Sequence, residues 1–339
     1  MVHQKLAVHL PMLLRETIHK IRRNKVFYYA NHYLQLAVPS SLFRKVLPGK
    51  LRSFDKYDTA YIRRRVDYYN KLNTFSQASN LDTFLKDIPS IKTNSAYRVD
   101  TLEYSRYFSQ TFKANFLFGD VTTVADVPSI QKSRPVNGDN TNAVILKLDK
   151  KRHFFFLKDR KKFSIKKNML IGRAHISQPH RMKFMEMYFD HPLCDLGQVN
   201  TNAGNPKWLK PRISMLDHLD YKFILSLEGN DVATNLKWIM SSNSIAVMPK
   251  PKYETWFMEG TLIPDFHYIQ IKDDYSDLEE RLQYYLDYPE EAQNIINNAQ
   301  QYIKQFLNPE QEDLISLLVL QKYFYCTSQT NEYPLKDLL

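Results

Sequence analysis

The 339-residue sequence predicts an α/β protein with a parallel sheet in its second half. The evidence is a run rich in aromatic and aliphatic residues (221–229), then helical spacing (230–242), then an apolar run that ends at proline (244–250). A strand, a helix and a strand in this order form a parallel pair with a right-handed crossover. The apolar fraction of 43% and the charged fraction of 24% are typical of a soluble globular protein with a sizeable core.

The other elements follow from the same kinds of pattern, in chain order. In the first half we expect a helix at 60–72, strands at 115–122, 143–148, 152–157 and 169–174, a loop at 128–142 and a helix at 180–189. In the second half we expect a strand at 266–271, a helix opened by a capping box at 276–279, a helix at 290–306 and an apolar last helix at 310–325 that packs across the domains. The segments that we expect to be distinct are 1–66, 67–200, 201–325 and a tail at 326–339.

Glycine is scarce: the chain holds eight, about 2% of its residues against a usual share of about 7%. No two of them lie within six residues of each other, so neither G-x-G-x-x-G nor G-x-x-x-x-G-K-[ST] fits anywhere. The sequence therefore excludes the glycine-rich phosphate loops.

The formal charge of +11 belongs to the first 66 residues, which hold 14 Lys and Arg and three acids. A basic head on a neutral body predicts docking to an anionic partner and argues against a broad nucleic-acid surface. Within the head, Leu14, Ile18 and Ile21 share a helical face beside basic residues, a pattern typical of segments that lie on anionic membranes. An ordinary surface helix is the alternative. The acidic helix expected at 277–291 is predicted to form a solvated face.

The sequence shows no pattern typical of secretion, of a membrane span or of a disulfide or zinc site. The sequence shows no signal peptide and no apolar stretch of about 18 residues, so we expect no membrane span. Cys194 and Cys326 are far apart in sequence, and no Cys/His spacing resembles a zinc site. We therefore expect a reducing cytoplasm, no disulfide and no metal.

Polar residues follow the strand at 221–229, which ends at Gly229. The residues expected to open the next helix are Asn230, Asp231, Val232, Ala233 and Thr234. A helix N-terminus presents free N–H groups and the positive end of its dipole, which favour a phosphate or a carboxylate at the carboxyl ends of strands. Either Asn235 or Lys237 could face that ligand. The alternative is a plain N-cap on a structural helix.

Two arginines and two aspartates are further candidates. Arg173 follows the strand at 169–174, and Arg181 is close behind it. A guanidinium there can clamp a diphosphate, with a surface salt bridge as the alternative. Asp120 and Asp139 follow strands in turn-like segments, and either can act as a general base, although turn aspartates often bond to their own backbone. No Asp-x-Asp occurs, so a divalent cation held by clustered carboxylates is not expected.

The segment 222–286 resembles glycosyltransferase family 90, also called CAP10-like, and in particular its bacterial lipopolysaccharide core biosynthesis members. The resemblance is a chain of motifs in order and covers about residues 100–325. The upstream motifs that carry it are FLFGDVT (116–122), KSRP (132–135), RHFFF (152–156), the segment around Arg173 and HPLCDLGQVN (191–200).

The resemblance implies a GT-B fold, in which two Rossmann-like domains face a cleft, here with a basic helical N-terminal segment. Residues 67–200 would form the acceptor-side domain and 201–325 the domain that binds the nucleotide sugar. The related protein O-glucosyltransferases invert the anomeric centre, use a UDP-sugar and need no metal ion.

The site residues of the family map onto this sequence by motif. The positions that the resemblance implies for donor binding are Gly229, Asn230, Asp231, Ala233, Thr234, Asn235 and Lys237 in the diphosphate loop, Arg173 and Arg181 before it, and Lys250, Tyr253 and Glu254 after it. Asp139 matches the catalytic aspartate more closely, by its position after Ser-Arg-Pro, and Asp120 is the alternative. Gly172 and Ala174 depart from the family pattern, which has an aromatic residue before the arginine and a glycine after it.

The predicted function is an inverting transfer of a hexose or pentose from a UDP-sugar to a lipopolysaccharide core or another surface glycan. No cofactor, metal or nucleic acid is expected, and the basic head would hold the enzyme on the inner face of the bacterial inner membrane. Two alternatives stay open: a membrane-surface or RNA-binding module that uses residues 1–66, and a sugar-phosphate transferase of capsule synthesis.

Overall fold

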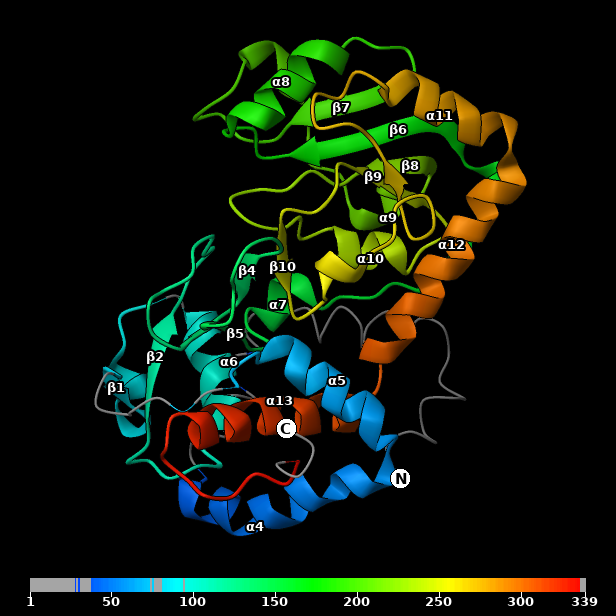
Figure 1. Ribbon diagram of the computed structural model, residues 1–339. Helices are drawn as coiled ribbons and strands as arrows, with labels where there is room; N and C mark the ends of the chain where they lie inside the picture. The colour runs from blue at the N-terminus through cyan, green and yellow to red at the C-terminus, as the bar shows by residue number, and fades with distance from the viewer. Residues whose placement is uncertain are drawn as a thin grey trace.

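The computed structural model describes residues 28, 30, 38–73, 75, 81–93 and 95–335, which form two lobes (Figure 1). The first lobe holds a four-stranded sheet and the second a five-stranded sheet. The mixed α/β class predicted from the sequence is thus confirmed, with parallel strands in both sheets. The amphipathic pattern at Leu14, Ile18 and Ile21 lies outside the described residues.

The sheet of the second lobe is parallel throughout. Its strands in spatial order are β11 (Ile269–Gln270), β9 (Ile245–Met248), β8 (Tyr221–Leu225), β6 (Lys167–Ala174) and β7 (Cys194–Gln198). The predicted β-loop-α-β unit is β8, the short helix α10 (Leu236–Met240) and β9. The chain winds one way from β6 to β7 and the other way from β8 onward, so β6 and β8 flank the topological switch point of the sheet.

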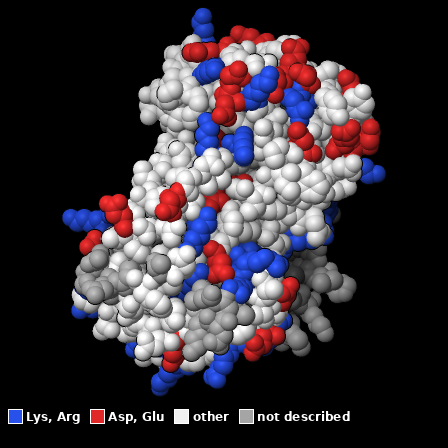
Figure 2. All heavy atoms as spheres, in the orientation of Figure 1, with Lys and Arg blue, Asp and Glu red and all other residues white. Residues whose placement is uncertain are grey.

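Helices cover both faces of this sheet. Those of the second lobe, besides α10, are α8 (Pro179–Tyr188), α9 (Met215–His218), α11 (Leu278–Asp287) and α12 (Pro289–Ile303). Phe184 of α8, Leu282 of α11 and Ile295 of α12 share one apolar core with Phe223 of β8. Five of the six acids in 277–291 are exposed, as predicted, and Figure 2 shows Asp and Glu gathered over this part of the lobe.

The first lobe is built on a smaller sheet. Its strands in spatial order are β1 (Thr83–Phe84), β2 (Lys113–Leu117), β3 (Ser129–Gln131) and β5 (Ala143–Ile145), of which β1 is antiparallel to β2. The helices around it are α4 (Ser40–Arg52), α5 (Thr59–Tyr69), α6 (Ser95–Ser105), α7 (Lys150–His153) and α13 (Pro309–Cys326).

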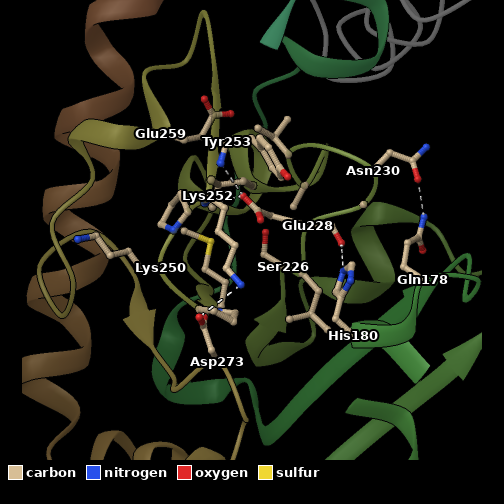
Figure 3. Close-up of a pocket in the computed structure, with 18 of the residues that line it drawn as sticks. Gln178, His180, Ser226, Glu228, Asn230, Lys250, Lys252, Tyr253, Glu259 and Asp273 are labelled. Carbon is tan, nitrogen blue, oxygen red and sulfur yellow. Dashed lines mark hydrogen bonds and ion pairs between the residues drawn. The ribbon is translucent and has the colours of Figure 1, made fainter. Parts of the chain in front are cut away.

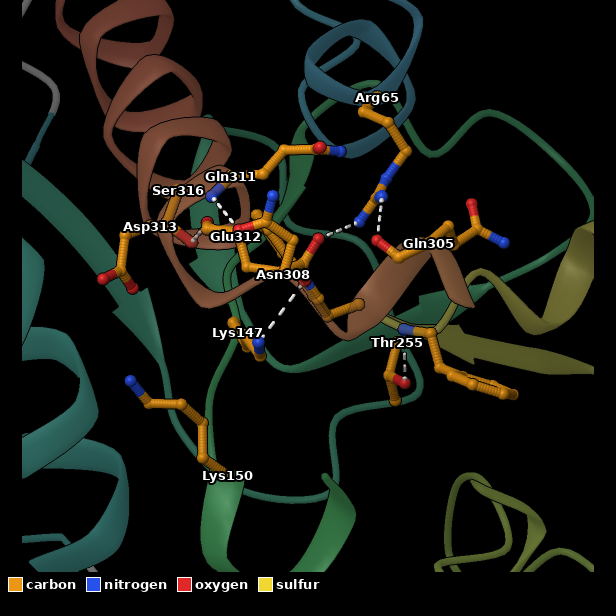
Figure 4. A network of polar contacts seen from close by, with 12 residues as sticks. Arg65, Lys147, Lys150, Thr255, Gln305, Asn308, Gln311, Glu312, Asp313 and Ser316 are labelled. Atoms are coloured by element: carbon orange, nitrogen blue, oxygen red, sulfur yellow. Dashed lines mark hydrogen bonds and ion pairs between the residues drawn. The ribbon is translucent and has the colours of Figure 1, made fainter. Parts of the chain in front are cut away.

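The last helix returns to the first lobe, where it packs on α4, α5 and α6. On α13 the buried Glu312 pairs with Arg65 of α5 at 2.8 Å and with Lys147 at 3.3 Å (Figure 4). Its carboxylate also accepts a hydrogen bond from Trp256 Nε1, at 2.6 Å. The helix that we expect to pack across the domains thus follows the strands of the second lobe in sequence and packs on the helices of the first.

The predicted segments 67–200 and 201–325 both contribute strands to the five-stranded sheet. β6 and β7 precede residue 201 but pair with β8, β9 and β11, so a division at 200/201 runs through one sheet. In the same way, α13 follows residue 201 but packs on helices of the first lobe. In both cases an element packs against partners that lie far from it in sequence, on the other side of residue 200.

Four local predictions are wrong. Residues 152–157 form the end of α7 and irregular backbone rather than a strand. The predicted loop 128–142 contains β3 and β4 (Ser133–Pro135), because β4 pairs antiparallel with the distant β10 (Tyr253–Thr255). The helix predicted from residue 230 begins only at Leu236. The capping box at 276–279 does not form, because the Ser276 side chain bonds to Asp274 and leaves Asp277 as the N-cap.

Among the described residues, no helix combines the length and the apolar character needed to cross a bilayer.

Candidate functional site

Two adjoining cavities open at the carboxyl ends of the parallel strands. The β9 cavity, of about 390 Å³, is lined by residues that follow β8 and β9 (Figure 3). The β6 cavity, of about 570 Å³, is lined by the end of β6, by the loop after β8 and by Asp120 of the first lobe. They share Gly229 and Asn230 in their linings. Both lie at the switch point, where ligands of open α/β sheets bind.

The loop 226–235 follows β8 and separates the two cavities. Arg181 of α8 lies against this loop, and its guanidinium donates to the carbonyl oxygens of Leu227 and Glu228, at 2.8 and 2.9 Å, and of His175, at 2.9 Å. No carboxylate of the described residues pairs with Arg181. The arginine therefore fixes the loop to the end of β6 and brings an uncompensated positive charge between the cavities.

Arg173, at the end of β6, lines the β6 cavity. Its Nη2 pairs with Asp195 of β7 at 2.8 Å, while its Nε, also buried, has no hydrogen-bond partner in the described structure. Burial alone would raise the pKa of Asp195, but hydrogen bonds from Tyr221, Lys210 and Arg173 outweigh it and lower that pKa to about 2. The carboxylate thus stays ionised and holds Arg173 at the cavity wall.

Of the two candidate bases, the structure places only Asp120 at a cavity. Asp120 follows Gly119, whose φ of +123° is a conformation that side-chain-bearing residues rarely adopt. Asp139 lies on an exposed turn, lines neither cavity and accepts a hydrogen bond from the backbone N–H of Thr141, at 2.9 Å. This is the turn-capping role that we gave as the alternative for an aspartate in such a segment.

Asp120 faces groups from both lobes. Its Oδ1 contacts Lys132 Nζ at 2.5 Å, and its Oδ2 accepts a hydrogen bond from Asn230 of the second lobe, at 3.4 Å. Burial would raise the pKa of Asp120, but the hydrogen bond and the charge of Lys132 outweigh burial and lower it. The carboxylate is therefore ionised at neutral pH and lies beside the loop that carries the other site residues.

The β9 cavity contains an acid that the sequence reasoning missed. The Glu228 carboxylate accepts hydrogen bonds from the backbone N–H groups of Lys252 and Tyr253, at 3.0 and 3.2 Å (Figure 3). Burial raises the pKa of Glu228 to about 7, against the effect of these hydrogen bonds. The available clue is an acidic residue in the last turn-forming positions of the predicted strand 221–229, directly before Gly229. Lys250 is exposed at the mouth of the same cavity.

The remaining predicted donor residues divide into two groups. Those that line a cavity are Gly229, Asn230, Asp231, Ala233, Thr234, Asn235, Lys250 and Tyr253. Lys237 and Glu254 line neither. Lys237 is fully buried and pairs with Glu259, and the buried Glu254 pairs with Arg134 at 2.8 Å.

The helix N-terminus that we predicted at Gly229 is absent from this loop. The Asn235 amide donates to the carbonyl oxygen of Leu225, at 2.9 Å, and so bends the chain back to the strand end. The helix starts after that bend, at Leu236. Polar groups at the site therefore come from a folded loop and from arginines rather than from a helix dipole. Among the described residues, no three His, Cys, Asp or Glu side chains group as metal ligands.

Comparison with known proteins connects this site to an enzyme family. Residues 151–328 match the model of glycosyl transferase family 90. The chain is 42% identical to O-glucosyltransferase LpsA of Dichelobacter nodosus over 304 residues, which are 89% of this chain and 95% of that protein. It is 30% identical to protein O-glucosyltransferase 3 of Homo sapiens over 161 residues, 44% of this chain and 31% of that one. The resemblance found in the sequence is confirmed, and the chain belongs to glycosyl transferase family 90.

Proposed function

We propose that this protein is an inverting glycosyltransferase that moves a hexose or pentose from a UDP-sugar to a lipopolysaccharide core or a similar surface glycan. The observation that carries the proposal is the meeting of Asp120 with Arg173, Arg181 and the loop 226–235 around one cavity between the lobes. The similarity to the bacterial O-glucosyltransferase LpsA supports a sugar as the transferred group.

The donor would span both cavities. Its diphosphate would lie near Arg173 and Arg181, because guanidinium groups match phosphate oxygens in charge and geometry. The nucleoside would occupy the β9 cavity beside Tyr253 and Lys250. In this arrangement the two arginines supply the positive charge that a bound divalent cation supplies in other enzymes.

The chemistry would be a single displacement at the anomeric carbon. Asp120 would take the proton of the acceptor hydroxyl while that oxygen attacks, and the bond to the UDP oxygen would break on the opposite face of the sugar. Arg173 and Arg181 would stabilise the negative charge that develops on the leaving diphosphate.

The direct test is a panel of UDP-sugars, incubated with deacylated lipopolysaccharide core in the presence of EDTA. We expect UDP release and a product heavier than the acceptor by one anhydrohexose or anhydropentose unit. A mass gain that includes a phosphate would show sugar-phosphate transfer instead. Activity that EDTA abolishes and manganese restores would contradict the metal-independent mechanism.

We also propose that an anionic membrane surface is a partner. On α4, Leu42 and Val46 are about half exposed, at 52% and 50%, beside the exposed Arg44 and Lys45. No acidic residue occurs in this helix. Exposed apolar side chains next to cations fit the boundary between anionic headgroups and acyl chains. Such docking would hold the enzyme at the inner face of the inner membrane, where lipid-linked acceptors are found.

A further inference from the structure

One buried lysine joins the two lobes at the site. Lys132 lies between β3 and β4 in the first lobe, and its side chain is 1% exposed. Its Nζ is 2.5 Å from Asp120 Oδ1 and 2.7 Å from Asp231 Oδ2, in the loop after β8. A buried ammonium is costly unless it is paired, and this one is paired with a carboxylate from each lobe.

We propose that Lys132 is a positioning residue for the transfer reaction: it keeps the Asp120 carboxylate ionised and fixes it to the loop 226–235. The inference rests on the proposed function, because Asp120 matters in this way only as the base. Lys132 itself lines neither cavity, so it would act through Asp120 and Asp231 rather than on a substrate.

The geometry supports a fixed base. Asn230 of the loop donates directly to Oδ2 of Asp120. Lys132 binds Oδ1 of Asp120 and also pairs with Asp231, the next residue of the loop. Both carboxylate oxygens are therefore held to the loop. Asn230 is itself held by Gln178, whose Nε2 lies 3.0 Å from the Asn230 Oδ1. A shift of the loop would therefore move the base with it.

The charges around Asp120 come from several elements. Lys132 and Arg152 of α7 favour its ionised form, and the Asn230 amide does so by hydrogen bonding. Asp149 and Asp231 carry negative charge nearby, and the Tyr97 hydroxyl of α6 lies 3.5 Å from Asp120 Oδ1. Burial favours neutral Lys132, but Asp231, Tyr97 and Asp120 outweigh it and raise the pKa of Lys132 to about 12. The lysine is therefore charged at every pH used in an assay.

The central experiment replaces Lys132 with methionine, which keeps most of the volume and removes the charge. We expect the pKa of Asp120 to rise by about 1 unit, because an opposite charge within hydrogen-bond distance lowers an aspartate pKa by about 1–3 units. The titration is followed by NMR of the full chain with ¹³C-carboxyl-labelled aspartate. Asp120→Asn assigns the signal, and this measurement needs no substrate.

The matching kinetic measurement is the pH profile of kcat/KM for UDP-glucose with deacylated lipopolysaccharide core. In Lys132→Met the acid limb should move to higher pH by the same amount as the NMR titration. Lys166→Met is the control, since Lys166 is equally buried and pairs with Asp159 at 2.7 Å away from both cavities. This control variant should be less stable than the unmodified protein, but the pKa of Asp120 should not change.

Two further variants keep the test decisive if Lys132→Met folds poorly. Asp231→Asn leaves Lys132 in place and removes a negative charge, so the Asp120 titration should stay or move to lower pH. Lys132→Met/Asp231→Asn also removes the buried Asp231 charge that the single lysine variant would leave without its partner, and it should still move the Asp120 titration to higher pH. An unchanged Asp120 titration in the double variant overturns the role of Lys132. Full transfer by Asp120→Asn overturns the proposed base instead, so the two failures appear in different measurements.

Discussion

At the scale of single residues, the two candidate bases differ in what surrounds them. Asp120 lies at the β6 cavity with Lys132 and Asn230 on its oxygens, whereas Asp139 caps its own turn in solvent. We expect Asp120→Asn to lower kcat by about 100-fold or more, the usual contribution of a general base. Asp139→Asn should stay within about twofold, as for a surface substitution.

The measurement for this pair is the initial rate of UDP release with donor and acceptor saturating. Circular dichroism of both variants serves to confirm that the fold is intact. Full activity in Asp120→Asn, or a large loss in Asp139→Asn alone, would return the role of base to Asp139.

Glu228 makes stability depend on pH. Its pKa of about 7 in the folded protein lies above that of an unfolded glutamate, so the folded state binds the proton more tightly. Its contribution to stability is therefore present below about pH 4.3 and is lost as the pH rises to 7. Glu228→Gln keeps an oxygen for the N–H groups of Lys252 and Tyr253 but does not titrate.

The quantity to follow is the free energy of unfolding of Glu228→Gln minus that of the unmodified protein. We expect this difference to be larger at pH 7 than at pH 4.3 by about 3 kcal/mol, since one pKa unit corresponds to ~1.4 kcal/mol. Urea denaturation at a series of pH values measures this difference. Glu186→Gln, on an exposed position of α8, is the control and should give a flat difference. A flat difference for Glu228→Gln as well would show that its carboxyl group is not buried in solution.

At the scale of elements, strand and helix positions follow from local pattern more reliably than loops do. β6, β8, β9, α8 and α13 lie close to their predicted ranges. Within the loop 226–235, the pattern predicts the end of a strand up to Gly229 and the start of a helix from Asn230. The shape of the loop depends on Asn235 bonding back to Leu225 and on Arg181 from α8, and neither contact is visible in the local spacing.

The contact between α5 and α13 gives a prediction at this scale. Glu312 is 1% exposed and is the carboxylate that pairs with Arg65 and Lys147. Glu312→Gln would leave the buried Arg65 without this charge partner, so we expect a loss of about 3–5 kcal/mol in the free energy of unfolding. Chemical denaturation measures the loss.

The matched control is Asp220→Asn, which removes the exposed pair between Lys161 and Asp220, with side chains 40% and 44% exposed. Pairs of this kind contribute about 0–1 kcal/mol. A loss for Glu312→Gln no larger than that of the control would mean that the buried pair does not hold α13 in place.

At the scale of the whole molecule, the position of α4 gives a prediction for membrane docking. Replacing Leu42 and Val46 with aspartate should weaken binding to vesicles that contain anionic phosphatidylglycerol by about tenfold or more, because it removes apolar burial and adds negative charge. Sedimentation with vesicles measures this binding. The control is Leu216→Asp, an equally non-conservative change at a 67% exposed leucine of α9 in the second lobe.

Vesicles of neutral phosphatidylcholine complete the comparison. We expect little binding of any variant to them, since attraction between basic residues and lipid depends on anionic headgroups. Equal binding of the α4 variant and the unmodified protein to anionic vesicles would contradict a docking role for this face.

The scarcity of glycine and the N-terminal position of the positive charge are properties of the sequence alone. They exclude glycine-rich phosphate loops and assign the +11 to the first 66 residues, because composition and order are independent of folding. The chain of motifs was also sufficient to identify the family, which the comparisons confirm. The same motifs indicate Arg173 and Arg181, and both line the β6 cavity.

Only the tertiary structure distinguishes Asp120 from Asp139 and removes Lys237 and Glu254 from the cavity linings. It also brings Lys132 between Asp120 and Asp231, which are 111 residues apart in sequence, and places Glu228 against the chain after β9. The physical reason is that these roles depend on burial and on charged partners from distant strands. Such partners meet only when the parallel sheet and the returning helix α13 are assembled.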